Sequence, residues 1–296
     1  MPDRLRDVTA SWGSIVATMP GAWPYHSPLW GNLLAEVFGG TFQVFELPLD
    51  GVCVPILSGG TLAADGFRCG HIGYGGALSP GADDLSLRAH IDAVAAVERR
   101  LLLPCKRLVT CPRARTAPVS TPHAGTVRET TLVDLPASTD ILWSSYAGSV
   151  RTAVRKCRRE GLTTRILGPA EAAAAAHLIG DTQSRVGAAY RVPTQLIGRL
   201  ARDESGFAYL VGCFRGDALL AVGVFLRAFG RVAYLYNGWE LEFRQLGANY
   251  LMLHQALAHA VAHGDRVMDL GFSHQRELRA FKERWGGRPA DLIVVE

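Results

Sequence analysis

The same order of predicted elements occurs twice in this chain: a strand hairpin, a strand that runs into a glycine-containing turn, a helix and a short buried strand. In the first half these elements are predicted at 42–47, 52–57, 67–74, 84–102 and 107–111. In the second half they are predicted at 207–215, 218–229, 232–236, 248–263 and 267–270. Tyr74-Gly75-Gly76 matches Tyr236-Asn237-Gly238 at an offset of about 160 residues, as an internal duplication would give.

Antiparallel strands followed by strand–helix–strand indicate an α/β (α+β) fold, with mixed, mostly antiparallel sheets flanked by helices. The first half adds a helix at 27–38, which Ser27-Pro28 begins and Gly39-Gly40 ends. The second half adds a strand at 163–167, helices at 170–187, 193–202 and 275–285, and a last strand at 291–295. The sequence therefore predicts two domains of similar construction, residues 1–145 and 146–296.

The composition supports a chain that buries a core. Hydrophobic residues make up 48% and charged residues 20% of the 296 residues. The longest clean apolar run, Ala218 to Leu226, is less than half of the about 20 residues that a membrane-spanning helix needs. The first residues lack the apolar stretch of a signal peptide, so we expect a cytoplasmic protein. The six cysteines form no Cys-x-x-Cys pair, so we expect reduced thiols and no metal site.

Basic residues cluster in one predicted helix. The net charge is +4, and the chain holds 28 arginines but only three lysines. Five cations fall within nine residues, namely Arg151, Arg155, Lys156, Arg158 and Arg159. Like charges four residues apart on a helix repel each other, and a bound polyanion would relieve that repulsion. Because the guanidinium group of arginine suits phosphate, these cations predict that the helix contacts phosphate or RNA. The alternative is a solvated helix face, partly neutralised by Glu160.

Four segments resemble the FemABX family of aminoacyl-tRNA-dependent ligases, whose members carry two tandem N-acetyltransferase (GNAT) domains. They are Tyr25-His26-Ser27-Pro28-Leu29-Trp30, the basic stretch 149–157, Ala248-Asn249-Tyr250-Leu251-Met252-Leu253, and Asp269-Leu270-Gly271 with Phe281-Lys282-Glu283-Arg284-Trp285-Gly286-Gly287. The last segment is the most specific. The chain has no room for the coiled-coil arm of the larger members, so it is similar to the short ones.

This resemblance implies transfer of an aminoacyl group from charged tRNA to the amino group of a peptide-like acceptor, with formation of an amide. The acceptor would be a peptide antibiotic intermediate, free or carrier-bound, or a cell-wall peptide precursor. Aminoacyl-tRNA serves as co-substrate, and because its ester is already activated, no cofactor, ATP or metal is required.

The resemblance also implies roles for individual residues. Lys282 would stabilise the charge that develops on the carbonyl oxygen and on the leaving ribose oxygen. Phe281 would pack against the terminal ribose or adenine. The family's acceptor contacts correspond to Thr182, Arg185, Tyr190 and Arg191, and its opening helix to Ser27 and Trp30. Tyr236 ends the central strand beside the sheet opening where this fold binds its substrates. His274 and Asp269 are candidate proton acceptors, although for Asp269 the preferred role is to order the loop after its strand.

Arg244-Gln245-Leu246-Gly247-Ala248-Asn249 opens a helix whose first amides can hold a phosphate, with Arg244, Gly247 and Asn249 as candidate contacts. The segment partly resembles the pyrophosphate loop of acetyl-CoA enzymes, but Asn249 stands where glycine or alanine is expected. An acyltransferase that uses acyl-CoA or acyl-carrier protein is therefore the second hypothesis. A non-catalytic double-GNAT module that binds RNA or a protein partner is the third.

Overall fold

The computed structural model describes residues 5–48, 50–70, 72–114, 125–188, 190–273 and 275–296. The chain forms two compact units, one of Met1–Thr130 with Pro289–Glu296 and one of Thr131–Arg288. The division thus falls at Thr130/Thr131, whereas the sequence placed it after residue 145. The last strand was also expected in the C-terminal domain, but it belongs to the first unit.

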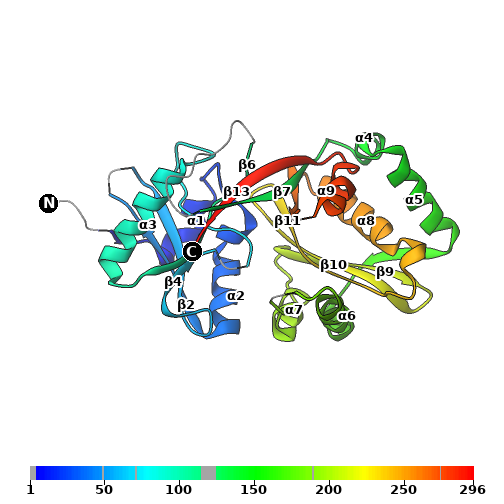
Figure 1. Cartoon of the computed structure of the whole chain (residues 1–296), viewed down its shortest axis with the longest axis horizontal. Helices are drawn as coiled ribbons and strands as arrows, with labels where there is room; N and C mark the ends of the chain where they lie inside the picture. Colours follow the sequence, from blue (N-terminus) through cyan, green and yellow to red (C-terminus); the bar gives the residue numbers. More distant parts are fainter. Residues whose placement is uncertain (1–4, 49, 71, 115–124, 189, 274) are drawn as a thin grey trace. The chain divides into compact units, whose positions relative to one another are not determined.

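The first unit is a mixed sheet with helices (Figure 1). Its helices are α1 (Trp12–Val16), α2 (Pro28–Phe38) and α3 (Leu87–Leu101). Its strands are β1 (Arg6–Asp7), β2 (Gly40–Glu46), β3 (Cys53–Gly59), β4 (Ala63–Cys69), β5 (Cys105–Val109), β6 (Arg113–Ala114) and β13 (Arg288–Val295). Strand β7 (Thr126–Asp134) contains the boundary between the units.

The second unit repeats this construction with longer strands (Figure 1). Its strands are β8 (Leu162–Ile166), β9 (Ala208–Arg215), β10 (Ala218–Ala228), β11 (Arg231–Trp239) and β12 (Val267–Phe272). Its helices are α4 (Thr139–Ser145), α5 (Gly148–Arg159), α6 (Ala172–Arg185), α7 (Thr194–Leu200), α8 (Ala248–Ala262) and α9 (Arg276–Glu283). No helix in the described ranges is both long and apolar enough to span a membrane.

The two units share one strand pattern. In each, three consecutive strands pair antiparallel and the third then pairs parallel with a fourth that follows a helix: β2-β3-β4 with β5, and β9-β10-β11 with β12. The crossover helices are α3 and α8. The expectation of two tandem GNAT-like units with mixed sheets is confirmed.

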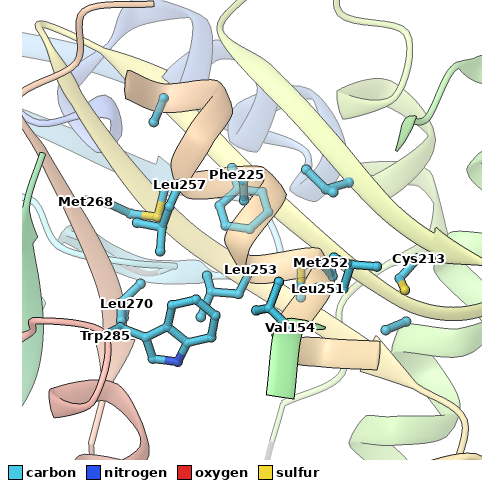
Figure 2. Close-up of a cluster of buried hydrophobic side chains, with 14 of the residues drawn as sticks. Val154, Cys213, Phe225, Leu251, Met252, Leu253, Leu257, Met268, Leu270 and Trp285 are labelled. Carbon is cyan, nitrogen blue, oxygen red and sulfur yellow. The ribbon is translucent and has the colours of Figure 1, made fainter. Parts of the chain in front are cut away.

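The core of the second unit lies between α8 and the sheet. Leu253 and Leu257 of α8 are buried there with Phe225 of β10. Figure 2 shows Trp285, just after α9, beside Leu270 of β12. The Trp285 side chain is 0% exposed, so α9 is anchored against the end of β12. This packing fixes the position of Lys282, which lies on α9 one turn before Trp285.

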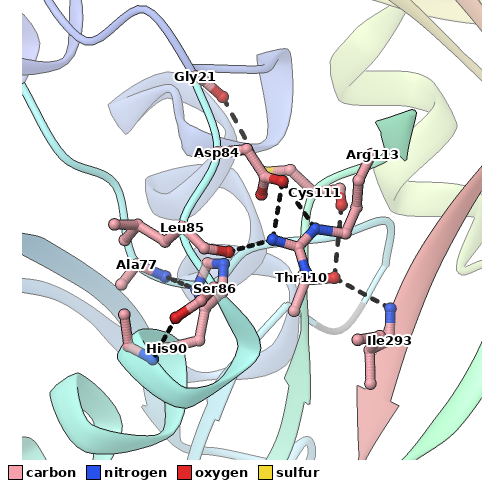
Figure 3. Close-up of polar contacts among 11 residues, drawn as sticks. Gly21, Ala77, Asp84, Leu85, Ser86, His90, Thr110, Cys111, Arg113 and Ile293 are labelled. Carbon is pink, nitrogen blue, oxygen red and sulfur yellow. Dashed lines mark hydrogen bonds and ion pairs between the residues drawn. The ribbon is translucent and has the colours of Figure 1, made fainter. Parts of the chain in front are cut away.

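The last strand completes the first unit. Strand β13 pairs antiparallel with β5, with Val294 opposite Val109. Thr110 extends this pairing, because its hydroxyl accepts the Ile293 amide at 2.9 Å (Figure 3). Nearby, Arg113 donates from Nε to the Asp84 carboxylate at 2.7 Å, which ties β6 to the segment before α3.

Candidate active site

A cavity opens where β11 and β12 part. The two strands pair in parallel only from Arg231/Val267 to Ala233/Asp269, although β11 continues to Trp239 and β12 to Phe272. A β-bulge at the same level of β11, between the pairs Val224/Tyr236 and Phe225/Tyr234, turns the strand. The cavity between the parted strands has a volume of about 530 Å³.

Aromatic side chains dominate the cavity wall. They come from β11, β12, α8, α9 and the segment after β11: Tyr234, Tyr236, Trp239, Phe243, Tyr250, Phe272 and Phe281. Among the described residues that line the cavity, the charged ones are Glu240, Arg244 and Lys282. Such a cavity suits a ligand with a planar or apolar body and a few charged groups.

Lys282 is the buried cation of this site. Its side chain is 5% exposed, and its Nζ donates to the carbonyl oxygens of Gly271 at 2.6 Å and Phe272 at 2.7 Å. It also donates to Ser273 Oγ at 3.2 Å. These carbonyls converge because Gly271 takes a φ of 77°, which glycine adopts without strain. The Asp269 carboxylate accepts the Gly271 amide at 2.8 Å, so Asp269 orders the loop after β12.

Phe281 precedes Lys282 and lines the same cavity. Its ring meets the Tyr250 ring edge-on at 5.2 Å and the Trp285 ring at 6.1 Å. It is therefore part of an aromatic cluster that joins α9 to the start of α8.

The turn before α8 contributes the predicted phosphate-binding residues. Gly247 has a φ of 73° and directly precedes the helix, and Arg244, Gly247 and Asn249 all line the cavity. The Asn249 Oδ1 is buried and has no hydrogen-bond partner among the described residues. The basic helix α5 reaches this turn, because Lys156 Nζ donates to the Gln245 carbonyl at 2.9 Å. Cys157 Sγ donates to the Leu246 carbonyl at 3.1 Å.

The arginines of α5 have different surroundings. Arg151 donates to the carbonyls of Ser144 and Tyr146 at the end of α4, so its guanidinium is engaged within the fold. Arg155 and Arg158 both stand over the Trp143 ring, at 5.4 and 6.0 Å from its centre.

Arg158 also donates to His254 Nε2 at 3.2 Å. Burial and, to a lesser degree, the Arg158 charge lower the pKa of His254 to about 4. Lys156 and Arg159 are exposed.

Two of the residues predicted to contact the acceptor, Thr182 and Arg185, hold a side chain that forms part of the cavity wall. Thr182 Oγ1 accepts the Trp239 amide at 2.9 Å. Arg185 donates to the Trp239 carbonyl at 2.7 Å and stacks over its ring at 4.3 Å. Neither residue lines the cavity itself; they hold Trp239, which does.

Tyr236 lines the cavity directly, and Tyr190 lies close enough to contribute to its raised pKa, of which burial is the larger cause. Arg191 is exposed.

Ser27 and Trp30 lie in the first unit. Ser27 Oγ accepts the Leu29 amide at 3.2 Å and caps α2. Trp30 is 2% exposed and meets the Tyr25 ring at 5.9 Å. Their contacts are those of a helix start and of a packed aromatic cluster. His274 lies outside the described residues.

Sequence reasoning assigned no site role to Trp239, Glu240 or Phe243, and it singled out Tyr250 only as part of the segment 248–253. Trp239-Glu240 directly follows Tyr236-Asn237-Gly238, so its position after the central strand was the available signal. The described residues include no group of three or more His, Cys, Asp or Glu side chains that could hold a metal ion.

Comparisons with known proteins concern the fold of the chain. Residues 144–283 match the family model of the acetyltransferase (GNAT) domain. No curated protein matches by sequence.

The crystal structure of FemX superposes with a TM-score of 0.68 at 14% identity, over 96% of this chain and 95% of that one. A C-terminal domain from Agrobacterium fabrum, named for lysylphosphatidylglycerol synthetase, gives 0.57 at 10% identity over 97% and 91%. L-PGS from Bacillus licheniformis gives 0.53 at 12% over 90% and 91%. The chain thus shares its fold with FemX and with these two further structures, and residues 144–283 of its C-terminal half match the GNAT acetyltransferase domain.

Proposed function

We propose that this protein transfers an aminoacyl group from charged tRNA to the amino group of a peptide-like acceptor. The observation that carries the proposal is the buried Lys282 ammonium at the wall of an aromatic cavity that adjoins a basic helix. The GNAT domain match and the fold shared with FemX support acyl transfer as the reaction class. A cytoplasmic location accompanies the proposal, since charged tRNA is made there.

The reaction needs little from the protein beyond placement and charge. The acceptor nitrogen attacks the ester carbonyl, the carbonyl carbon to ribose oxygen bond breaks, and the amine proton passes to the leaving oxygen. Negative charge develops on two oxygens during these steps, and a buried ammonium stabilises it strongly. Lys282 lines the cavity, so its ammonium would lie close to the oxygens of an ester bound there.

The donor end would occupy the aromatic part of the cavity. Bases and ribose stack on aromatic rings with about 1–3 kcal/mol per base, and Phe281, Tyr250 and Phe243 offer such rings. Lys156 and Arg159 on α5, together with Arg244 at the cavity, would contact phosphates of the tRNA end.

The amine would be recognised by Glu240. It is the one carboxylate among the described residues that line the cavity. It directly follows Trp239, whose ring already stacks on one cation, the Arg185 guanidinium. Carboxylate and aromatic faces together attract an ammonium group before it loses its proton.

Acyl transfer from acyl-CoA or acyl-carrier protein is the second candidate function. Gly247 at the start of α8 and the GNAT domain match favour it. The Asn249 side chain lines the cavity where that loop would carry glycine or alanine, and a side chain of this size disfavours a bound pyrophosphate. The third hypothesis, a non-catalytic RNA-binding module, does not explain why a lysine is buried at the wall of this cavity.

The test is a transfer assay with aminoacyl-tRNAs radiolabelled one amino acid at a time, run beside labelled acetyl-CoA and acyl-carrier protein. The acceptors are mixed peptides with free primary amines. We expect amide-linked label from one or a few aminoacyl-tRNAs and none from acetyl-CoA. Label from acetyl-CoA or the carrier alone would establish the second function, and tight tRNA binding without transfer from any donor would establish the third.

A further inference from the structure

Behind Lys282 lies a buried polar chain that does not line the cavity. Ser273 follows β12 and is 4% exposed, and Thr131 on β7 is 0% exposed. Their hydroxyl oxygens are 2.9 Å apart. Lys282 Nζ, Ser273 Oγ and Thr131 Oγ1 thus form a continuous line of contacts within the second unit.

The chemistry of the groups sets the direction of the bond from Lys282. An ammonium only donates, so Ser273 Oγ accepts from Lys282, while either hydroxyl can donate in the bond between Ser273 and Thr131. Hydrogen bonds to a charged form favour that form and raise the pKa of an amine. Buried hydroxyls also fix a neighbour's position, because losing their partner leaves a costly unsatisfied group.

We propose that Ser273 and Thr131 are positioning residues that hold the Lys282 ammonium in place and keep it protonated at the cavity wall. The proposal rests on the proposed function for its catalytic consequence, but the network itself is independent of that function. Other titratable groups around it are Asp269, which accepts the Gly271 amide, and the phenols of Tyr234 and Tyr250, which line the cavity.

The three lysines of the chain permit a direct measurement. In protein labelled with ¹⁵N-lysine, at most three Nζ signals arise, from Lys106, Lys156 and Lys282. The Lys282 signal, assigned by its loss in Lys282→Arg, should resist exchange with water because this ammonium is buried. In Ser273→Ala it should exchange faster and titrate at lower pH, and Thr131→Val should act in the same direction.

Matched variants separate positioning from folding. Thr131→Ser keeps the hydroxyl and should restore the wild-type Lys282 signal. Ser184→Ala removes an exposed hydroxyl that bonds Gly180 in α6 and should leave the signal unchanged. The Lys156 and Lys106 signals serve as internal references in each spectrum.

Kinetics provide the second readout. Ser273→Ala should lower kcat by about 10- to 100-fold, the loss typical of a displaced reacting group, with KM for tRNA unchanged. The alkaline limb of its pH profile should move to lower pH, because the Lys282 ammonium loses its proton sooner. An unchanged Lys282 signal and titration in Ser273→Ala would overturn the proposal. So would a fall in kcat with an unmoved pH profile, which marks a purely structural role. If wild-type protein transfers nothing, the proposed function fails, while the Lys282 spectra still decide the network.

Discussion

A lysine that is buried in a chain with 28 arginines stands out by its surroundings. Three oxygens from Gly271, Phe272 and Ser273 hold the Lys282 Nζ, a geometry that suits a compact ammonium and not a planar guanidinium. The sequence drew attention to this residue by its rarity and its neighbour Phe281. Its hydrogen-bond partners depend on the backbone turn at Gly271, and the spacing of residues in the sequence does not predict that turn.

We expect Lys282→Met to lower kcat for aminoacyl transfer by about 100- to 1,000-fold, the usual loss of one charged donor at a developing oxyanion. The Kd for tRNA should change little, because the interaction is made in the transition state. Lys282→Arg should recover only part of the rate. Single-turnover kinetics and filter binding on folded variants measure both quantities; a Met variant within about threefold of wild type would remove Lys282 from the reaction.

His254 predicts a pH dependence of stability. Its Nε2 accepts from Arg158, so the ring is neutral in the fold, and burial and Arg158 lower its pKa from 6.5 to about 4. The stability that it contributes is present above pH 6.5 and is lost as pH falls towards 4, with a slope of up to about 1.4 kcal/mol per pH unit.

Urea unfolding at pH 7, 6 and 5 tests this dependence. In His254→Gln the fall in unfolding free energy between pH 7 and 5 should be shallower than in wild type. His177→Gln changes an exposed histidine that pairs with Asp181, and it should keep the wild-type slope. Equal slopes in all three proteins would mean that His254 carries a proton in the fold.

At the scale of elements, helix α5 shows what periodicity can and cannot predict. The helix and its basic face lie where the sequence placed them, but the face is not one uniform array. Arg151 caps the end of α4, Arg155 and Arg158 stand over Trp143, and Lys156 and Arg159 are exposed. A partner such as Trp143, eight residues before the first of these arginines, cannot be read from helical spacing.

If α5 contacts tRNA phosphates, affinity should fall with salt by a slope of about 0.7 to 0.9 per contact. Lys156→Ala with Arg159→Ala should weaken binding and flatten this slope by about one to two units. Arg151→Ala should instead lower stability with the slope unchanged, because its guanidinium is bonded to backbone carbonyls. Filter binding from 50 to 300 mM salt gives the slopes, and one common slope for all variants would reassign α5 to the solvated surface.

Helix α6 packs against β11 at a glycine. A Cβ on Gly238 would lie 2.6 Å from backbone atoms of Leu178 and Ile179, so Gly238→Ala must push α6 away and should cost about 1–3 kcal/mol. Gly180, within α6, has nothing within 4 Å of such a Cβ. Gly180→Ala should therefore stabilise by about 0.5–1 kcal/mol. Thermal unfolding of the two variants should show shifts of opposite sign; a neutral Gly238→Ala would contradict the close approach.

Elements with weak patterns escaped prediction. Strand β7 and helix α4 were not expected, and the predicted strand at 67–74 is β4, Ala63–Cys69. Two other strands were predicted closely. The strands expected at Val52 to Leu57 and at Ala218 to Phe229 begin and end within two residues of the observed bounds of β3 and β10. Alternating apolar residues identify a strand from its own sequence. A β-bulge, or the point at which β11 and β12 cease to pair, depends on residues elsewhere in the chain.

At the scale of the whole molecule, the repeated order of elements carried the fold prediction. It gave two units of the same kind because each half supplies its own hairpin, crossover helix and parallel strand. It could not give the cavity, because that depends on where β11 and β12 separate. Nor could it give the partner of the last strand, since Asp291 to Val295 would suit either sheet by composition.

The pairing of β13 with β5 sets an order in which the molecule can be completed during synthesis. Val109 must wait for Val294, which is 185 residues later, or roughly 10 to 40 s at ribosomal rates of about 5–20 residues per second. The second unit is continuous from Thr131 to Arg288, so all its strands emerge before β13 does. During that interval β5 presents an unpaired edge, the kind of surface that recruits foreign strands. The unit that is translated first is therefore the one that closes last.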